Sequence, residues 1–120
     1  MKKNSFITSK VLFFFLLIFI SCEKVDCRKL ISIYRKGSFN IVVKETPLPF
    51  SKHNFYITGK SLNTNKDTIY DEENRWLCDY YKEIEIGDTI RKKENEAILS
   101  IFKKDTVLNL QFNCNGTNYN

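Results

Sequence analysis

The fold is decided by the stretch AILSIFKKDTVLNLQFN, residues 97–113, in which two alternating segments flank a charged turn. Apolar and polar residues alternate from Leu108 to Phe112 in the second segment. This period of two is typical of an antiparallel strand that buries one face. The stretch therefore predicts a β-hairpin with strands at 97–103 and 106–113.

Shorter segments of the same kind occur upstream, about ten residues apart and separated by turns. Their β-branched and aromatic residues favour strands. With the hairpin they give about seven short strands, which predicts a mainly β fold, a small antiparallel β-sandwich or barrel. The upstream segments are residues 30–34, 39–44, 54–60, 67–70, 83–86 and 89–90.

One segment, residues 71–82, has helical spacing. Asp71 suits an N-cap, and Trp76 lies four residues before Tyr80, so a helix would place both rings on one side. We expect at most one short helix here, in addition to an N-terminal signal helix. Trp76 and Tyr80 belong to residue types that fill cores and also dominate binding surfaces. Core packing is the default, and joint exposure would indicate a protein or carbohydrate contact.

The N-terminal segment has the three parts of a secretory signal. Three lysines precede an uninterrupted apolar run at residues 11–20, and small Ser21 follows. The run is too short for a permanent membrane span, which needs about 20 apolar residues. We therefore expect cleavage before Cys22.

The end of this signal, Phe19, Ile20, Ser21 and Cys22, resembles the lipobox of bacterial lipoproteins. The match is close at the last two positions, whereas Phe19 stands where the family favours leucine. The composition, rich in Lys and Asn and poor in Gly, is similar to that of small Bacteroidota lipoproteins. The resemblance implies that Cys22 is acylated, palmitate being one such acyl group, and that this anchor holds the chain on a membrane without spanning it.

Three parts of the chain follow from this interpretation: a lipoprotein signal peptide at 1–21, the lipidated cysteine with a polar tether at 22–29, and a single β-rich domain at 30–120. The expected location is the cell envelope. Glu23, rather than aspartate, after the cysteine favours the outer membrane under the enterobacterial sorting rule. The alternatives are an ordinary secretory signal, with Cys22 as an unmodified cysteine, and an uncleaved N-terminal anchor.

The net charge of +5 comes largely from the signal. Its removal takes three of the 19 basic residues and none of the 14 acidic ones, which leaves +2. Nucleic-acid binding requires a clustered basic face, so we expect no nucleic-acid partner.

The four cysteines are Cys22, Cys27, Cys78 and Cys114. Disulfides are permitted in an exported chain. If Cys22 is acylated, the other three can form at most one bridge, and the sequence does not choose between Cys27–Cys114 and Cys78–Cys114. None of the cysteines has zinc-knuckle spacing, and the single histidine, His53, is remote from them in sequence, so we expect no metal site.

Catalytic signals are weak. His53 lies in a proline-bounded loop, where an exposed side chain is more common than a catalytic base. A glycosidase carboxylate pair could be sought among four acidic side chains, Asp71, Glu72, Glu73 and Asp79, but helix capping and solvation explain the first three more simply. We therefore expect neither an enzyme nor a cofactor, and no catalytic residue is assigned.

The leading hypothesis is a lipid-anchored, non-enzymatic domain for binding or protection, with an unknown protein or glycan partner in the envelope. The first alternative is an immunity or inhibitor protein directed against a toxin or hydrolase. The second is a small envelope hydrolase that acts on glycan or peptide.

Overall fold

The computed structural model describes residues 25–46 and 48–120. The predicted signal peptide, Cys22 and the first residues of the predicted tether lie outside this part. Within the described part, none of the helices combines the length and apolarity needed to cross a membrane.

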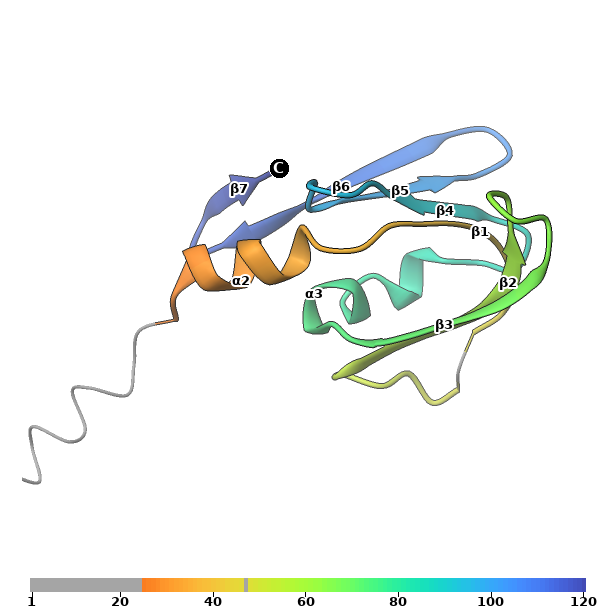
Figure 1. The fold of residues 1–120 in the computed structure, drawn as a ribbon, viewed down its shortest axis with the longest axis horizontal. Coiled ribbons are helices and arrows are strands. Elements are labelled where there is room, and N and C mark those ends of the chain that lie inside the picture. The colour runs from red at the N-terminus through yellow and green to blue at the C-terminus, as the bar shows by residue number, and fades with distance from the viewer. Residues whose placement is uncertain (1–24, 47) are drawn as a thin grey trace, which may run out of the picture.

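Seven antiparallel strands form one sheet in the order β3-β2-β1-β4-β5-β6-β7. The mainly β prediction is confirmed. The sheet is strongly bent but open, with β3 and β7 at its edges, and helices rather than a second sheet lie on its concave side (Figure 1). The strands are β1 Phe39–Glu45, β2 Asn54–Ser61, β3 Asp67–Glu73, β4 Thr89–Lys92, β5 Ile98–Phe102, β6 Val107–Cys114 and β7 Thr117–Tyr119.

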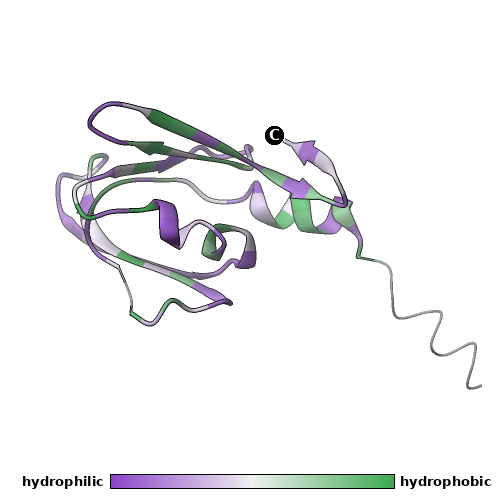
Figure 2. Cartoon of the chain, turned by 180° about the vertical axis from the view of Figure 1, so that it is seen from behind, coloured by the Kyte–Doolittle hydropathy of each residue, from purple (hydrophilic) through white to green (hydrophobic). Residues whose placement is uncertain are grey.

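The predicted hairpin is the β5–β6 pair. Leu99 lies opposite Leu110 and Ile101 lies opposite Leu108, so these four side chains share the inner face. Hydrophobic and hydrophilic segments accordingly alternate along β6 (Figure 2). The turn closes with a hydrogen bond from the Lys103 backbone N to the Thr106 carbonyl oxygen.

The core lies between the inner face of the sheet and two short helices, α3 Arg75–Cys78 and the 3-10 helix η1 Tyr81–Glu83. Both belong to the connection from β3 to β4, which crosses the concave side and places β4 next to β1. The largest fully buried apolar side chains are Val43, Phe55, Ile57, Leu77, Tyr81, Ile90, Leu99 and Ile101.

The helix predicted over 71–82 starts later than expected. Asp71, Glu72 and Glu73 belong to β3, where Asp71 lies opposite Tyr56. Asn74 is the N-cap instead, and its side-chain oxygen accepts a hydrogen bond of 2.9 Å from the backbone N of Leu77. Pairing with β2 thus outweighs the helix signal of the first three residues.

A further helix, α2 Cys27–Tyr34, replaces the strand predicted at 30–34 and the last part of the predicted tether. Asp26 caps it by accepting hydrogen bonds from the backbone N of Arg28 and of Lys29. Ile31 and Tyr34 are buried beneath it. The described fold therefore begins at Cys27, three residues before the predicted boundary.

The strand predicted at 83–86 is also absent. Glu83 ends η1, and Ile86 is 72% exposed. The predicted turn at 87–88 is present: Gly87 has a positive φ of 94°, and the Asp88 carboxylate accepts hydrogen bonds from the Glu85 backbone N and the Lys103 Nζ. This turn directs the chain into β4.

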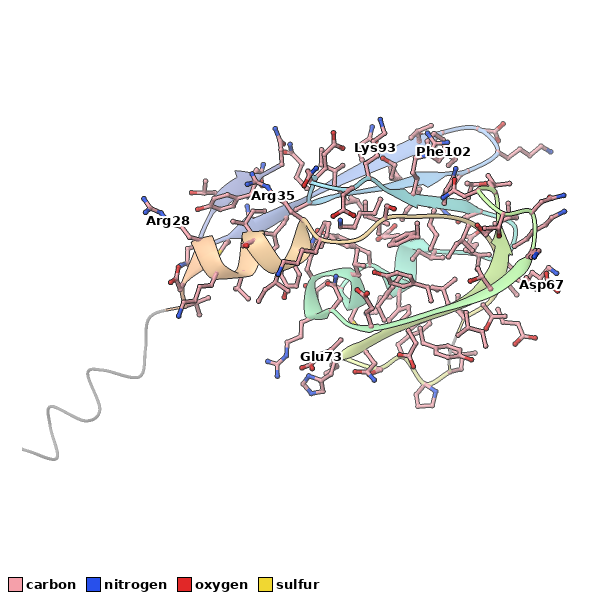
Figure 3. All side chains as sticks on the ribbon, viewed as in Figure 1. Arg28, Arg35, Asp67, Glu73, Lys93 and Phe102 are labelled. Atoms are coloured by element: carbon pink, nitrogen blue, oxygen red, sulfur yellow. A yellow bond between two sulfur atoms is a disulfide. The ribbon has the colours of Figure 1, made fainter. Side chains whose placement is uncertain are left out.

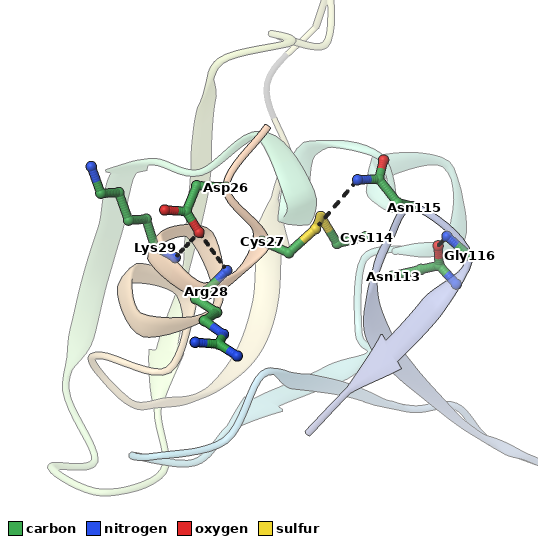
Figure 4. The surroundings of a disulfide bond; sticks show 8 residues. All are labelled: Asp26, Cys27, Arg28, Lys29, Asn113, Cys114, Asn115 and Gly116. Carbon is green, nitrogen blue, oxygen red and sulfur yellow. Dashed lines mark hydrogen bonds between the residues drawn. A yellow bond between two sulfur atoms is a disulfide. The ribbon is translucent and has the colours of Figure 1, made fainter. Parts of the chain in front are cut away.

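A disulfide joins Cys27, the first residue of α2, to Cys114, the last residue of β6 (Figure 4). The two cysteines are 87 positions apart in the sequence. This is one of the two pairings that the sequence left open. Cys78 is a free, half-buried thiol.

The buried amine of Lys92 holds the end of α2 against the sheet. Only 2% of this residue is exposed, and its Nζ donates hydrogen bonds to the carbonyl oxygens of Lys36, Gly37 and Lys93. Burial lowers the pKa of Lys92. Three acceptors compensate the buried charge, as burial of an ammonium group requires.

Candidate functional site

A groove of about 690 Å³ lies between α2, α3, residues 52–53 and the end of β6. We call it the aromatic groove. Its apolar lining consists of Val25, Leu30, Tyr34, Trp76, Tyr80 and Phe112. Its polar lining consists of Lys52, His53, Arg75, Asp79 and Asn113.

Four of the side chains that line the groove are aromatic rings packed against one another. The Trp76 centroid lies 5.7 Å from Tyr34, 6.0 Å from Phe112 and 6.5 Å from Tyr80. Tyr34 and Phe112 are 4.9 Å apart, edge to face. These spacings lie in the range at which aromatic pairs stabilise one another.

Trp76 belongs both to the core and to the groove. It is 4% exposed, and its indole Nε1 has no hydrogen-bond partner among the described residues. A buried indole N–H normally finds an acceptor. Tyr80 is half-buried beside it. The two predicted binding aromatics therefore lie together but are not exposed together, because Trp76 is buried and Tyr80 is half-buried.

His53 and Asp79 lie on the polar rim without forming a catalytic pair. The His53 side chain is exposed, and no hydrogen bond or ion pair joins it to Asp79 in the described part of the chain. His53 supports the site through its backbone, because its carbonyl oxygen accepts a hydrogen bond from the backbone N of Asn74. The loop thus positions the start of α3.

The other predicted acidic residues are not brought to the groove. Asp71, Glu72 and Glu73 lie on β3, an edge strand. Glu72 accepts a hydrogen bond of 2.8 Å from the Tyr70 hydroxyl. The four carboxylates considered together in the sequence are thus divided between β3 and the groove rim.

Cys78 borders a separate hollow with Phe50 and Tyr81. Burial, with a smaller contribution from the Asp79 carboxylate, raises the pKa of the Cys78 thiol. A raised pKa favours the protonated form, which is a poor nucleophile and a poor metal ligand.

No group of three or more His, Cys, Asp or Glu side chains in residues 25–46 and 48–120 is arranged to hold a metal ion. The groove offers instead aromatic side chains and a rim of charged and amide groups. This combination suits a ligand that has both an apolar part and polar groups.

The sequence indicated Trp76, Tyr80 and His53 but missed Leu30, Tyr34 and Phe112 as partners in one site. The sequence did contain a signal for Leu30 and Tyr34, because Cys27, Leu30, Ile31 and Tyr34 have the spacing of one helical face. Phe112 could be predicted as an inward-facing strand residue, but its contact with Trp76 spans distant parts of the sequence.

Comparison with known proteins found no matching family model, no similar curated protein and no similar solved structure.

Proposed function

We propose that this chain is a lipid-anchored protein of the bacterial envelope whose domain binds a partner through the aromatic groove and catalyses no reaction. The observation that carries the proposal is the groove between α2, α3 and β6, whose lining combines four aromatic rings with charged and amide side chains. Trp and Tyr are the residue types that most often dominate binding surfaces.

The N-terminal sequence supports the anchor. The lysines, the apolar run and Ser21 precede Cys22, which is the acylated residue in this proposal. Because α2 begins at Cys27, the tether is shorter than the sequence indicated. The proposed location is the outer membrane, and the short tether keeps the domain close to its surface.

The composition of the groove supports binding. Its apolar lining gives contact area, while Lys52, Arg75, Asp79 and Asn113 provide polar contacts at the rim. The proposed partner is a protein or glycan of the envelope, and nucleic acid is not proposed. The aromatic groove combines a buried aromatic centre with a polar rim, as binding surfaces do.

Intact mass tests the anchor. We expect the protein extracted from the membrane fraction of its host to have the mass of residues 22–120 plus acyl chains, and to gain two hydrogens on reduction of Cys27–Cys114. An unacylated mass that gains four hydrogens would contradict the proposal, because it would mean that Cys22 forms a second disulfide.

Photo-crosslinking tests the groove. A photoreactive phenylalanine analogue at Tyr80 should form adducts with one envelope protein or glycan in intact cells. The matched control is Tyr56, another half-buried tyrosine, on the outer face of β2. Adducts from both positions, or from neither, would contradict binding through the groove.

A further inference from the structure

Two of the exposed large apolar residues belong to α2 or to the segment just before it. Val25 is 59% exposed and Ile33 is 54% exposed. Ile33 is four residues after Lys29, so these two side chains lie on the same side of α2, and Lys36 lies two residues beyond the end of the helix. We define the α2 face as Val25, Lys29, Leu30, Ile33 and Lys36.

The α2 face is positively charged. Lys29 and Lys36 are exposed, and the ion pairs of the described residues, Lys44–Asp67 and Lys103–Asp88, include neither of them. The nearby carboxylate of Asp26 accepts hydrogen bonds from the α2 backbone.

The adjoining hollow, lined by Leu30, Ile33 and Tyr34, adds one charge of each sign, from Arg75 and Glu73. The excess positive charge of the α2 face is therefore not neutralised there. Figure 3 shows Arg28 at the α2 end of the molecule and Asp67 at the opposite end.

The position of Cys22 limits how far this face can be from an anchor. Val25 is only three positions after Cys22, and an extended chain covers at most about 11 Å over three positions. An acyl group on Cys22 therefore brings Val25 and the start of α2 to the level of the lipid head groups.

We propose that the α2 face is a membrane-contact surface that lies on anionic lipid head groups, with Ile33 and Val25 inserted between them. This inference rests on the proposed anchor at Cys22. The basic residues are attracted by the negative surface, and the two apolar side chains leave water at the interface. The contact fixes the orientation of the domain, with the aromatic groove opening beside the membrane.

Lysine labelling of the purified anchored protein tests this orientation. The protein is reconstituted into vesicles of phosphatidylcholine with phosphatidylglycerol, and into vesicles of phosphatidylcholine alone. We expect labelling of Lys29 and Lys36 to be at least about threefold slower in the anionic vesicles. Lys66 and Lys104, in turns away from α2, should react equally in both. Equal labelling of Lys29 in the two vesicle types would overturn the proposal.

A pair of matched variants separates insertion from other causes of protection. Ile33→Asp should abolish the protection of Lys29 and Lys36, because a carboxylate repels anionic head groups and does not insert. Ile69→Asp is the control, since Ile69 is 60% exposed and lies two residues from Asp67 at the far end. Protection that survives Ile33→Asp would refute contact through this face.

The two proposals fail in different ways. Recovery of the chain without acyl groups in the soluble fraction would refute the anchor, and the membrane contact with it. An acylated chain whose Lys29 reacts at the same rate in both vesicle types would refute the membrane contact alone and leave the anchor intact.

Discussion

Replacing both Cys27 and Cys114 by serine is expected to lower the free energy of unfolding by about 4 kcal/mol. The bridge closes a loop with a sequence separation of 87, and a long loop restricts the unfolded chain strongly. It also joins the start of α2 to the end of β6, two elements that form the same wall of the aromatic groove. Urea denaturation followed by circular dichroism measures the change.

Cys78→Ser is the matched control, because Cys78 is a half-buried free thiol. It should cost less than about 1.5 kcal/mol, since no covalent link is lost and the side chains have similar size. A double variant that loses no more stability than Cys78→Ser would show that the bridge does not stabilise the native fold.

Gly59→Ala should have the second large effect, a loss of more than about 3 kcal/mol. Gly59 lies in the middle of β2, opposite Val43 of β1. A Cβ atom at this position would stand 2.1 Å from the Val42 carbonyl oxygen and 2.5 Å from the Cγ2 of Ile41. Because the nearer contact is with backbone, the two strands would have to separate.

Gly116→Ala provides the comparison for Gly59→Ala. Gly116 has a positive φ of 85°, but a Cβ there would meet nothing within 4 Å. Its substitution should therefore cost only the left-handed backbone penalty, about 1 to 2 kcal/mol. Equal losses for the two variants in thermal or urea unfolding would contradict the close approach of β1 and β2.

The elements predicted best from the sequence are those formed by neighbouring segments. The β5–β6 hairpin and the turn at Gly87 follow from alternation and turn residues within a few positions of each other. Such contacts depend on local spacing, which one sequence displays directly.

The elements predicted wrongly depend on distant contacts. Residues 30–34 alternate over a short window, yet the helical face that includes Cys27 lies against the sheet and is tied to Cys114. Asp71 is a suitable N-cap for a predicted helix, yet it belongs to β3 because it pairs with Tyr56 of β2. In both places tertiary contact outweighs local propensity.

The candidate site was predicted in part for the same reason. Trp76 and Tyr80 were recognisable because they lie four residues apart in one segment. Trp76 contacts Tyr34 and Phe112, which come from segments near opposite ends of the sequence. The strand order that brings those ends together cannot be read from alternation alone.

The Cys27–Cys114 bond also determines how the molecule responds to mechanical tension. A pull that enters at Val25 and leaves at Tyr119 passes directly through the two sulfur atoms. Strands β1 to β5 lie within the closed loop and carry none of this load, whereas the pairing of β7 with β6 is loaded because β7 follows Cys114. A domain held at one end and pulled at the other therefore extends only by the few residues outside the bridge, although its sheet is held only by ordinary hydrogen bonds.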